Sequence, residues 1–462
     1  NLFRRFFAEG AFNQAFIPIY SDFEKENQSA STREFLNSLS AALISSLFIF
    51  TILVLVFAPI FIFIFAPGFY FDPIKKDLSI NILRIMFPYL ALISLVAFAG
   101  GIQNSHKQFT IPAFTPVIFN LSLITAAISI APRYEIPIYA LAWSVFLAGL
   151  LQLLLQILPL WRINRLPVPK FNLNNAGLKK FLRLIIPAIL AGGIIQINLL
   201  VDTIFASLLE TGSPTWLYVS DRLIQFPMGI FAIAIGTILL PTLSKYDLGY
   251  EKDKFINSLQ KGQKFVLYIG VPCLIGLFFC AEDLVSTIFY RGAFTEKDVI
   301  NSSYSLMAFS FGLPFFMLMK VLTPAFFARK DTATPMLVAF LSLILNASLN
   351  YYLAFVLDFG HVGIAIGSSL AAFISVCILE IMLYKNGFIK LISIINIFNL
   401  NIVISSLFLV TFLYFFTASI DFMKINQIQR IFYLSIEVVV SIIIYFSISR
   451  MILKKSVREL FY

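Results

Sequence analysis

Charged residues are scarce in this sequence. Asp, Glu, Lys and Arg make up only 13% of its 462 residues, about half the share of an ordinary soluble domain. Hydrophobic residues make up 59%, the mean hydropathy is +0.89, and no stretch is left for a separate soluble domain. The net charge of +10 comes from basic residues in short segments between apolar runs, where the positive-inside rule explains them better than nucleic-acid binding does. The composition therefore indicates a polytopic membrane protein.

Cysteine and histidine are nearly absent. Cys273, Cys280 and Cys377 lie in apolar segments without CxxC spacing, and His106 and His361 are isolated. This pattern indicates neither a disulfide framework nor a metal site. The sequence also lacks a nucleotide-binding loop, a paired-carboxylate motif for diphosphate chemistry and any Ser/His/Asp or Cys/His set. We therefore predict a protein that is not an enzyme and that has no cofactor.

Apolar runs of roughly 20 residues, the length that crosses a hydrocarbon core of about 30 Å, recur along the whole chain. We predict thirteen membrane spans, at residues 2–20, 38–66, 79–103, 111–131, 137–161, 178–209, 214–244, 263–290, 299–327, 333–357, 361–384, 392–418 and 429–453. The chain starts with Asn1 rather than Met, and no secretory signal precedes the first span. We therefore expect that the beginning of the protein is missing.

Basic residues are distributed unevenly between the loops. The side of the membrane that carries residues 21–37 has 22 Lys and Arg and the opposite side has 7, which predicts that the first side and the C-terminus are cytoplasmic. The other five of the 34 basic residues fall within predicted spans: Arg4, Arg5, Arg84, Arg222 and Lys320. An arginine at the centre of a membrane helix costs roughly 2.5–3.5 kcal/mol, so such residues normally face a wet cavity. Arg84 lies near a span start and is expected to anchor the interface.

Short matches recur at a constant offset of 223 residues. They pair residues 18–21 with 241–244, 107–112 with 330–335, and 140–142 with 363–365. Six spans separate the copies, so both copies run in the same direction through the membrane, and binding sites are expected between the halves. The alternative is chance, since Pro and Lys are common at span ends. The repeat predicts one further helix before residue 1, lobes at 1–161 and 162–390, and a terminal helix pair at 391–462.

The first predicted span carries three charged residues, Arg4, Arg5 and Glu9. Arg5 and Glu9 are spaced i,i+4 and can pair on one helix face, whereas Arg4 points about 100° away. At 1.5 Å per residue these side chains lie roughly 20 Å from the cytoplasmic end of the span. This depth favours a cavity that receives an anionic substrate. The alternative is that the arginines snorkel to the interface and that Glu9 neutralises them.

Asp221 and Arg222 form the corresponding feature of the second half. Arg222 and Arg4 lie at comparable depths in their halves, so the two guanidinium groups can oppose each other across a central cleft, where their forked donors suit a pyrophosphate. The alternative is an Asp–Arg pair that locks helix packing. Lys320 and Asp202 also lie within apolar spans, and for each of them a cavity-lining role and a buried structural pair are equally compatible with the sequence.

Several of these segments resemble, in the same order, the MurJ (MviN) family of bacterial lipid II flippases. The matching segments are residues 1–18 (NLFRRFFAEGAFNQAFIP), 87–89 (FPY), 104–114 (NSHKQFTIPAF), 202–207 (DTIFAS), 221–222 (DR) with 226–227 (FP), and 236–244 (GTILLPTLS). The resemblance covers most of the chain and is weakest after about residue 390. Gln225 departs from the pattern, because some relatives carry glutamate there.

The resemblance implies the architecture of the MOP exporter superfamily. This is an all-α polytopic membrane protein with two pseudo-symmetric six-helix lobes around a cationic cavity and two C-terminal helices that border a lipid-tail groove, here without the first helix. The family pattern implies substrate-binding arginines at Arg4 and Arg222, with Arg5, Glu9 and Asp221 nearby. Lys320 and Asp202 complete our set of candidate substrate-binding residues.

The resemblance also implies a function. A flippase of this family translocates lipid II, an undecaprenyl-pyrophosphate-linked peptidoglycan precursor, from the cytoplasmic to the periplasmic leaflet of the bacterial inner membrane by alternating access. A coupling ion is left open as a further partner. The alternatives are an exporter of another lipid-linked glycan, a MATE-like antiporter, or a membrane enzyme acting on polyprenyl phosphates. An antiporter of organic cations should favour acidic cavity residues, and the enzyme is opposed by the missing acid pairs.

Overall fold

The computed structural model describes residues 11–25, 29–172, 174–246, 250–389 and 397–453. Within these ranges all regular secondary structure is helical, and eleven helices are long and apolar enough to cross a membrane. These helices confirm the predicted all-α membrane fold. The chain divides into two compact units, residues 1–200 (unit 1) and 201–462 (unit 2). The lobe boundaries expected after residues 161 and 390 stay predictions.

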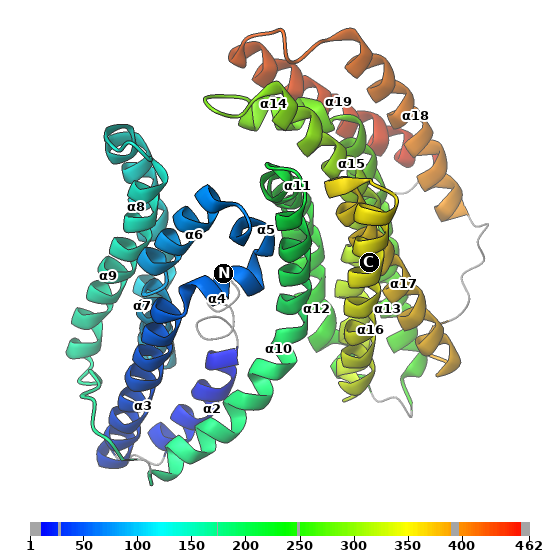
Figure 1. Ribbon diagram of the computed structural model, residues 1–462. Helices are drawn as coiled ribbons and strands as arrows, with labels where there is room; N and C mark the ends of the chain where they lie inside the picture. The colour runs from blue at the N-terminus through cyan, green and yellow to red at the C-terminus, as the bar shows by residue number, and fades with distance from the viewer. Residues whose placement is uncertain (1–10, 26–28, 173, 247–249, 390–396, 454–462) are drawn as a thin grey trace. The chain divides into compact units, whose positions relative to one another are not determined.

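Unit 1 consists of helices joined by short connections (Figure 1). They are α2 (Ala11–Lys25), α3 (Ser29–Val56), α4 (Ala58–Phe65), α5 (Pro67–Tyr70), α6 (Pro73–Met86), α7 (Tyr89–Ser105), α8 (Thr110–Thr125), η1 (Ala126–Ile130), η2 (Ala131–Arg133), α9 (Ile138–Arg162) and the first part of α10 (Ala176–Leu208). α7 packs against α2, α3 and α9. Pro88, which lacks a backbone N–H, separates α6 from α7. Phe16 of α2, Phe35 of α3 and Phe98 of α7 are buried together in an aromatic core.

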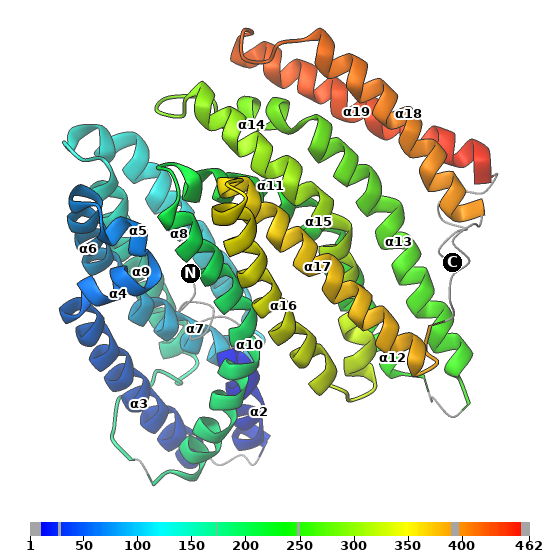
Figure 2. The ribbon, with the colours of Figure 1, turned by 45° about the vertical axis from the view of Figure 1, so that its right-hand side comes forward.

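Unit 2 is organised around its longest helix, α15. Its elements are the end of α10 (Ala176–Leu208), α11 (Ser213–Pro227), η3 (Met228–Ala232), α12 (Ile233–Ser244), α13 (Lys252–Phe279), α14 (Ala281–Phe289), α15 (Glu296–Ala328), α16 (Ala333–Tyr351), η4 (Tyr352–Val356), α17 (Gly360–Lys385), α18 (Ile397–Ser419) and α19 (Gln427–Leu453). α15 packs against α11, α12, α13, α14 and α17. α18 and α19 lie side by side at the edge of this unit and contact it through α13 and α14 (Figure 2).

The helix boundaries repeat at the predicted offset of 223 residues. α3 and α13 both contain 28 residues and begin at residues 29 and 252. α8 and α16 begin at residues 110 and 333, and α9 and α17 end at residues 162 and 385. The backbone follows the same period: Lys107 and Lys330 have φ of 60° and 59°, and Asn164 and Gly387 have φ of 55° and 69°. Residues with a left-handed backbone thus follow matching helices in both halves, at two positions in each half. This agreement favours a true internal repeat over chance.

Eleven of the thirteen predicted spans coincide with the eleven long apolar helices. The span at 178–209 lies in α10, and the span at 2–20 falls partly outside the described residues, which begin with α2. Two predicted span ends are wrong, since α3 ends at Val56 rather than at 66 and α13 ends at Phe279 rather than at 290. Pro59 lies in the first turn of a new helix, α4. Cys280 has a non-helical backbone (φ −88°, ψ 17°), which separates α13 from α14.

Candidate functional site

Four of the seven predicted site residues lie within the described part of the chain, all in unit 2. Asp202 lies on α10, Asp221 and Arg222 lie on α11, and Lys320 lies on α15. Arg4, Arg5 and Glu9 lie outside the described residues. Asp202 and Asp221 are close enough to interact electrostatically. They belong to separate hydrogen-bond groups, because Asp202 accepts hydrogen bonds from α16 and Asp221 accepts one from its own helix.

One face of α11 is fixed to α15. Gly212 precedes the helix with φ of +111°, and a Cβ at this position would lie 2.5 Å from the Trp216 ring, so both the backbone and the packing require glycine. Trp216 Nε1 donates a hydrogen bond of 2.7 Å to Asp298 Oδ1 on α15. The hydroxyl of Ser220, one turn later, lies 2.7 Å from the backbone oxygen of Ser302, also on α15. These contacts set the rotation of α11 about its own axis.

The α11 polar stripe consists of Tyr218, Asp221, Arg222 and Gln225. These residues are spaced by three or four positions and therefore lie on one face of the helix. Gln225 Nε2 donates to Asp221 Oδ2, and the Arg222 guanidinium lies over the Tyr218 ring, 4.9 Å from its centroid, which is a cation–π contact. No ion pair joins Arg222 to a carboxylate of the described residues.

This arrangement suits an anionic ligand. The Arg222 side chain is exposed, and its cation–π contact with Tyr218 does not pair its N–H donors with an acceptor oxygen. Those donors match the oxygens of a phosphate in a bidentate geometry. A neutral glutamine at position 225 also leaves the stripe with one carboxylate rather than two. Arg222 can therefore bind an anion without first breaking an ion pair to the described carboxylates.

A change in helix type follows the stripe directly. α11 ends at Pro227, the π-helical segment η3 comes next, and α12 begins at Ile233. π-Helical turns within helices are frequent at functional sites. Beyond η3, a Cβ at Gly236 would lie 3.0 Å from the backbone oxygen of Lys320, so α12 lies directly against α15. The Lys320 side chain itself is exposed. The irregular segment is thus held against α15 on both sides.

Asp202 is the centre of a second polar group, the Asp202 network, which also contains Asn346, Asn350 and Ser368. Asn346 Nδ2 and Asn350 Nδ2 donate to Asp202 Oδ1 at 2.8 and 2.6 Å. The Ser368 hydroxyl lies 3.4 Å from Asp202 Oδ2 and 3.2 Å from Asn346 Oδ1. These side chains come from α10, α16 and α17, so the network joins three helices.

The network contains oxygen atoms that can accept further contacts. Asn346 and Asn350 are wholly buried, and Asn350 Oδ1 has no hydrogen-bond donor. A Cβ at Gly367 would lie 2.3 Å from that oxygen, so only glycine fits beside it. The amide and hydroxyl donors to the Asp202 carboxylate are neutral, so they do not compensate a negative charge on it. Groups of three or more His, Cys, Asp or Glu that could hold a metal ion do not occur among the described residues.

Sequence reasoning singled out Asp202 but missed its partners. Asn346 and Asn350 are spaced i,i+4 within an apolar helix, and two amides on one face of a membrane helix are a signal that we did not use. Their separation from Asp202, by 144 and 148 residues, hides the contact in the sequence.

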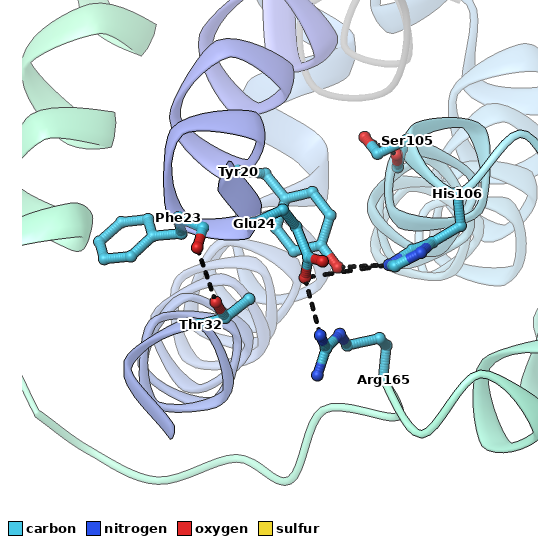
Figure 3. A network of polar contacts seen from close by, with 8 residues as sticks. Tyr20, Phe23, Glu24, Thr32, Ser105, His106 and Arg165 are labelled. Atoms are coloured by element: carbon cyan, nitrogen blue, oxygen red, sulfur yellow. Dashed lines mark hydrogen bonds and ion pairs between the residues drawn. The ribbon is translucent and has the colours of Figure 1, made fainter. Parts of the chain in front are cut away.

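A further network, in unit 1, lies around the end of α2 (Figure 3). The Tyr20 hydroxyl and His106 Nε2 are hydrogen-bonded at 2.8 Å. Arg165 lies 3.0 Å from Glu24 Oε1, and His106 Nε2 lies 4.0 Å from the same oxygen. Figure 3 shows the Glu24 carboxyl group between His106 and Arg165. The network ties α2, which follows Arg4, Arg5 and Glu9 in the sequence, to the segments after α7 and α9.

Comparison with known proteins places the chain in one family. The family model described as "Lipid II flippase MurJ" matches residues 1–449. A protein of Haemophilus influenzae named "Probable lipid II flippase MurJ" is 35% identical over 459 residues, which cover 96% of this chain and 89% of the relative.

Solved structures agree with this assignment. A lipid II flippase MurJ in an inward closed conformation superposes with a TM-score of 0.80 at 25% identity, covering 98% of this chain and 90% of that one. An inward-facing MATE family multidrug transporter of the MOP superfamily has a TM-score of 0.63 at 12% identity, covering 81% and 86% of the two chains. The second likeness concerns the fold alone.

Proposed function

The chain belongs to the MurJ family of lipid II flippases, and from this premise we propose how its residues carry the lipid. The protein is a multi-pass protein of the bacterial inner membrane and a flippase for lipid II. Its family is one of transporters rather than of enzymes. The chemical task is to move a pyrophosphate and its attached sugars and peptide across an apolar layer, while the polyprenyl tail remains in lipid.

Arg222 is proposed as the residue of unit 2 that binds the pyrophosphate. The observation that carries this assignment is the exposed guanidinium on the α11 polar stripe, which lies over the Tyr218 ring and has no ion pair with the described carboxylates. Tyr218 orients the side chain, and the donors at the guanidinium edge bind phosphate oxygens. Arg4, Arg5, Glu9, Asp221 and Lys320 remain the other proposed substrate contacts.

Alternating access is proposed as the way in which the head group crosses. The parallel internal repeat supports this mechanism, because transporters with such repeats bind substrate between halves that rock against each other. The π segment between α11 and α12 lies next to the stripe. It therefore offers a place where this helix can change its bend while α15 holds both of its ends.

Asp202 is proposed as the site of the coupling ion rather than as a substrate contact. The hydrogen bonds from Asn346, Asn350 and Ser368 favour an ionised Asp202 carboxylate but bring it no positive charge, which favours a cation nearby. Asp202, Asn350 and Ser368 offer oxygen atoms alone, which suits a hard monovalent cation or a proton. We also propose that the C-terminus is cytoplasmic, because the loops on its side carry 22 of the basic residues.

Binding of lipid II to the purified protein tests the role of Arg222. We expect Arg222→Ala to weaken binding at least tenfold, which is about 1.4 kcal/mol, whereas Arg222→Lys retains part of the affinity because it keeps the charge but loses the fork. Arg291→Ala, at an exposed arginine in a loop of the same unit, is the matched control and should leave the affinity unchanged. Equal affinities of Arg222→Ala and the unsubstituted protein would refute the assignment.

A further inference from the structure

Unit 2 contains two buried carboxyl groups that the proposed transport mechanism does not use. Asp283 lies on α14 and Glu437 lies on α19, two helices that pack against each other (Figure 1). Glu437 has no exposed surface and Asp283 is 5% exposed. The two carboxyl groups are direct neighbours, and the thiol of Cys280 lies beside Glu437. Cys280 is 4% exposed, so the whole group is closed to solvent.

The oxygen atoms of this pair lack ordinary partners. Neither Glu437 Oε1, Glu437 Oε2 nor Asp283 Oδ2 has a hydrogen-bond partner, and no ion pair links either residue to a basic side chain of the described residues. Arg430 lies two turns before Glu437, but its guanidinium is directed at the backbone oxygens of Phe422 and Met423, at 2.6 and 3.2 Å.

Acidic residues surround the pair on the α14 side. Glu282 adjoins Asp283 on α14 and adds negative charge to the site. Asp421 and Glu296 lie near Glu282, and Lys424 is paired with Asp421 at 2.7 Å. Among the described residues, therefore, the nearby cations are bonded elsewhere, Arg430 to backbone oxygens and Lys424 to Asp421, and neither forms an ion pair with the two carboxylates.

Two neighbouring carboxylates in a site closed to solvent cannot both keep their charge, because desolvation and mutual repulsion each oppose ionisation. We propose that Asp283 and Glu437 form a proton-binding site in which one proton is shared between the two carboxyl groups. The proton joins one oxygen of each carboxyl group in an O–H···O hydrogen bond, which two of the three unpartnered oxygens can form. A divalent metal ion fits less well, since Ca²⁺ and Mg²⁺ take about six or more oxygen ligands and the described residues contain no group of three or more His, Cys, Asp or Glu that could hold a metal ion.

Occupancy of this site is linked to the packing of the terminal helix pair. α19 is paired with α18, and α14 belongs to the body of unit 2 around α15. With one proton bound, the two carboxyl groups form a hydrogen bond between α14 and α19. Without it, two like charges face each other at the same position. Gln427 Nε2, which donates to the backbone oxygen of Thr287 at 2.7 Å, is a second α14–α19 contact and does not depend on the proton.

Infrared difference spectroscopy of the purified, full-length protein in lipid nanodiscs tests this proposal directly. The carbonyl stretch of a protonated carboxyl group is distinct from the bands of an ionised carboxylate. The spectrum at neutral pH should contain such a band, and Glu437→Gln and Asp283→Asn should each remove it. Glu210→Gln, at an exposed carboxylate paired with Lys297, is the matched control and should retain it. A spectrum that is unchanged by both substitutions overturns the proposal.

The pH dependence of unfolding gives a second readout. Above the pKa of an unfolded carboxyl group, about 4, the native pair holds one proton more than the unfolded chain does. The folding equilibrium constant should then fall by up to tenfold per pH unit as the pH rises, until the native site itself loses its proton. Glu437→Gln should remove this slope, and sodium at constant pH should not change it. A slope that persists in Glu437→Gln, or a sodium-dependent stabilisation lost in that variant, contradicts a proton site.

Discussion

Asn350→Ala tests whether Asp202 carries a charge in the folded protein. This substitution removes the amide that donates to Asp202 Oδ1 at 2.6 Å. A hydrogen bond to a charged group contributes about 1.5–3 kcal/mol, whereas an interhelical hydrogen bond between neutral groups in a membrane contributes about 0.6 kcal/mol on average. We expect Asn350→Ala to lower the free energy of unfolding by about 2 kcal/mol, because the acceptor is a carboxylate.

The same substitution in an Asp202→Asn background isolates the charge. The acceptor is then neutral, so Asn350→Ala should cost only about 0.6 kcal/mol, and the double-mutant cycle should give a coupling energy of about 1.4 kcal/mol. Reversible unfolding in mixed lipid–detergent micelles measures all four free energies. Asn401→Ala is the matched control, because Asn401 is wholly buried and donates to a neutral hydroxyl, Ser449 Oγ, at 2.9 Å. A coupling energy below about 0.5 kcal/mol would refute the charged acceptor and, with it, the proposed ion site.

Three further predictions concern packing, pH and topology. Gly363→Ala should destabilise the protein by about 1–3 kcal/mol, because the added Cβ would lie 2.7 Å from the backbone nitrogen of Ala354. Gly276→Ala, where the added Cβ meets open space, should not destabilise it. Equal thermal stabilities of the two variants would contradict this prediction. Hydrogen bonds from the backbone and hydroxyl of Thr334 lower the pKa of Asp331, so this contact stabilises the protein above about pH 4 and is lost as the pH falls through the lowered pKa. Asp331→Ala should flatten that acid limb of the unfolding curve, and an unchanged limb would contradict it. A reporter that is active only in the cytoplasm should be active when fused to the C-terminus, and activity of a periplasmic reporter there would reverse the predicted topology.

The positions of most helices follow from hydropathy, and the internal repeat follows from a few residues. Lys107 and Lys330 begin matching segments of the sequence, and both have a left-handed backbone after equivalent helices. The span ends near residues 66 and 290 could not be predicted in the same way. The apolar run continues past Val56 and past Phe279, so hydropathy does not register the first-turn proline of α4 or the non-helical backbone of Cys280.

The candidate site was predicted in part. Asp202, Asp221 and Arg222 were recognisable because charge within an apolar span is costly. Their partners depend on tertiary structure: Asn350 reaches Asp202 across 148 residues. The cation–π contact of Arg222 with Tyr218 has a spacing of i,i+4 and was accessible from the sequence, but an aromatic residue on an apolar helix is too common to stand out.

Rescue of cells depleted of their own lipid II flippase tests the central claim most directly. The intact gene, its Arg222→Ala variant and its Arg291→Ala control are compared at matched expression, and the amount of lipid II accessible at the outer face of the inner membrane is measured. We predict that the intact protein and the control restore this accessibility and that Arg222→Ala does not. Full accessibility with Arg222→Ala would contradict the proposed pyrophosphate contact, and failure of the intact protein would contradict lipid II transport itself.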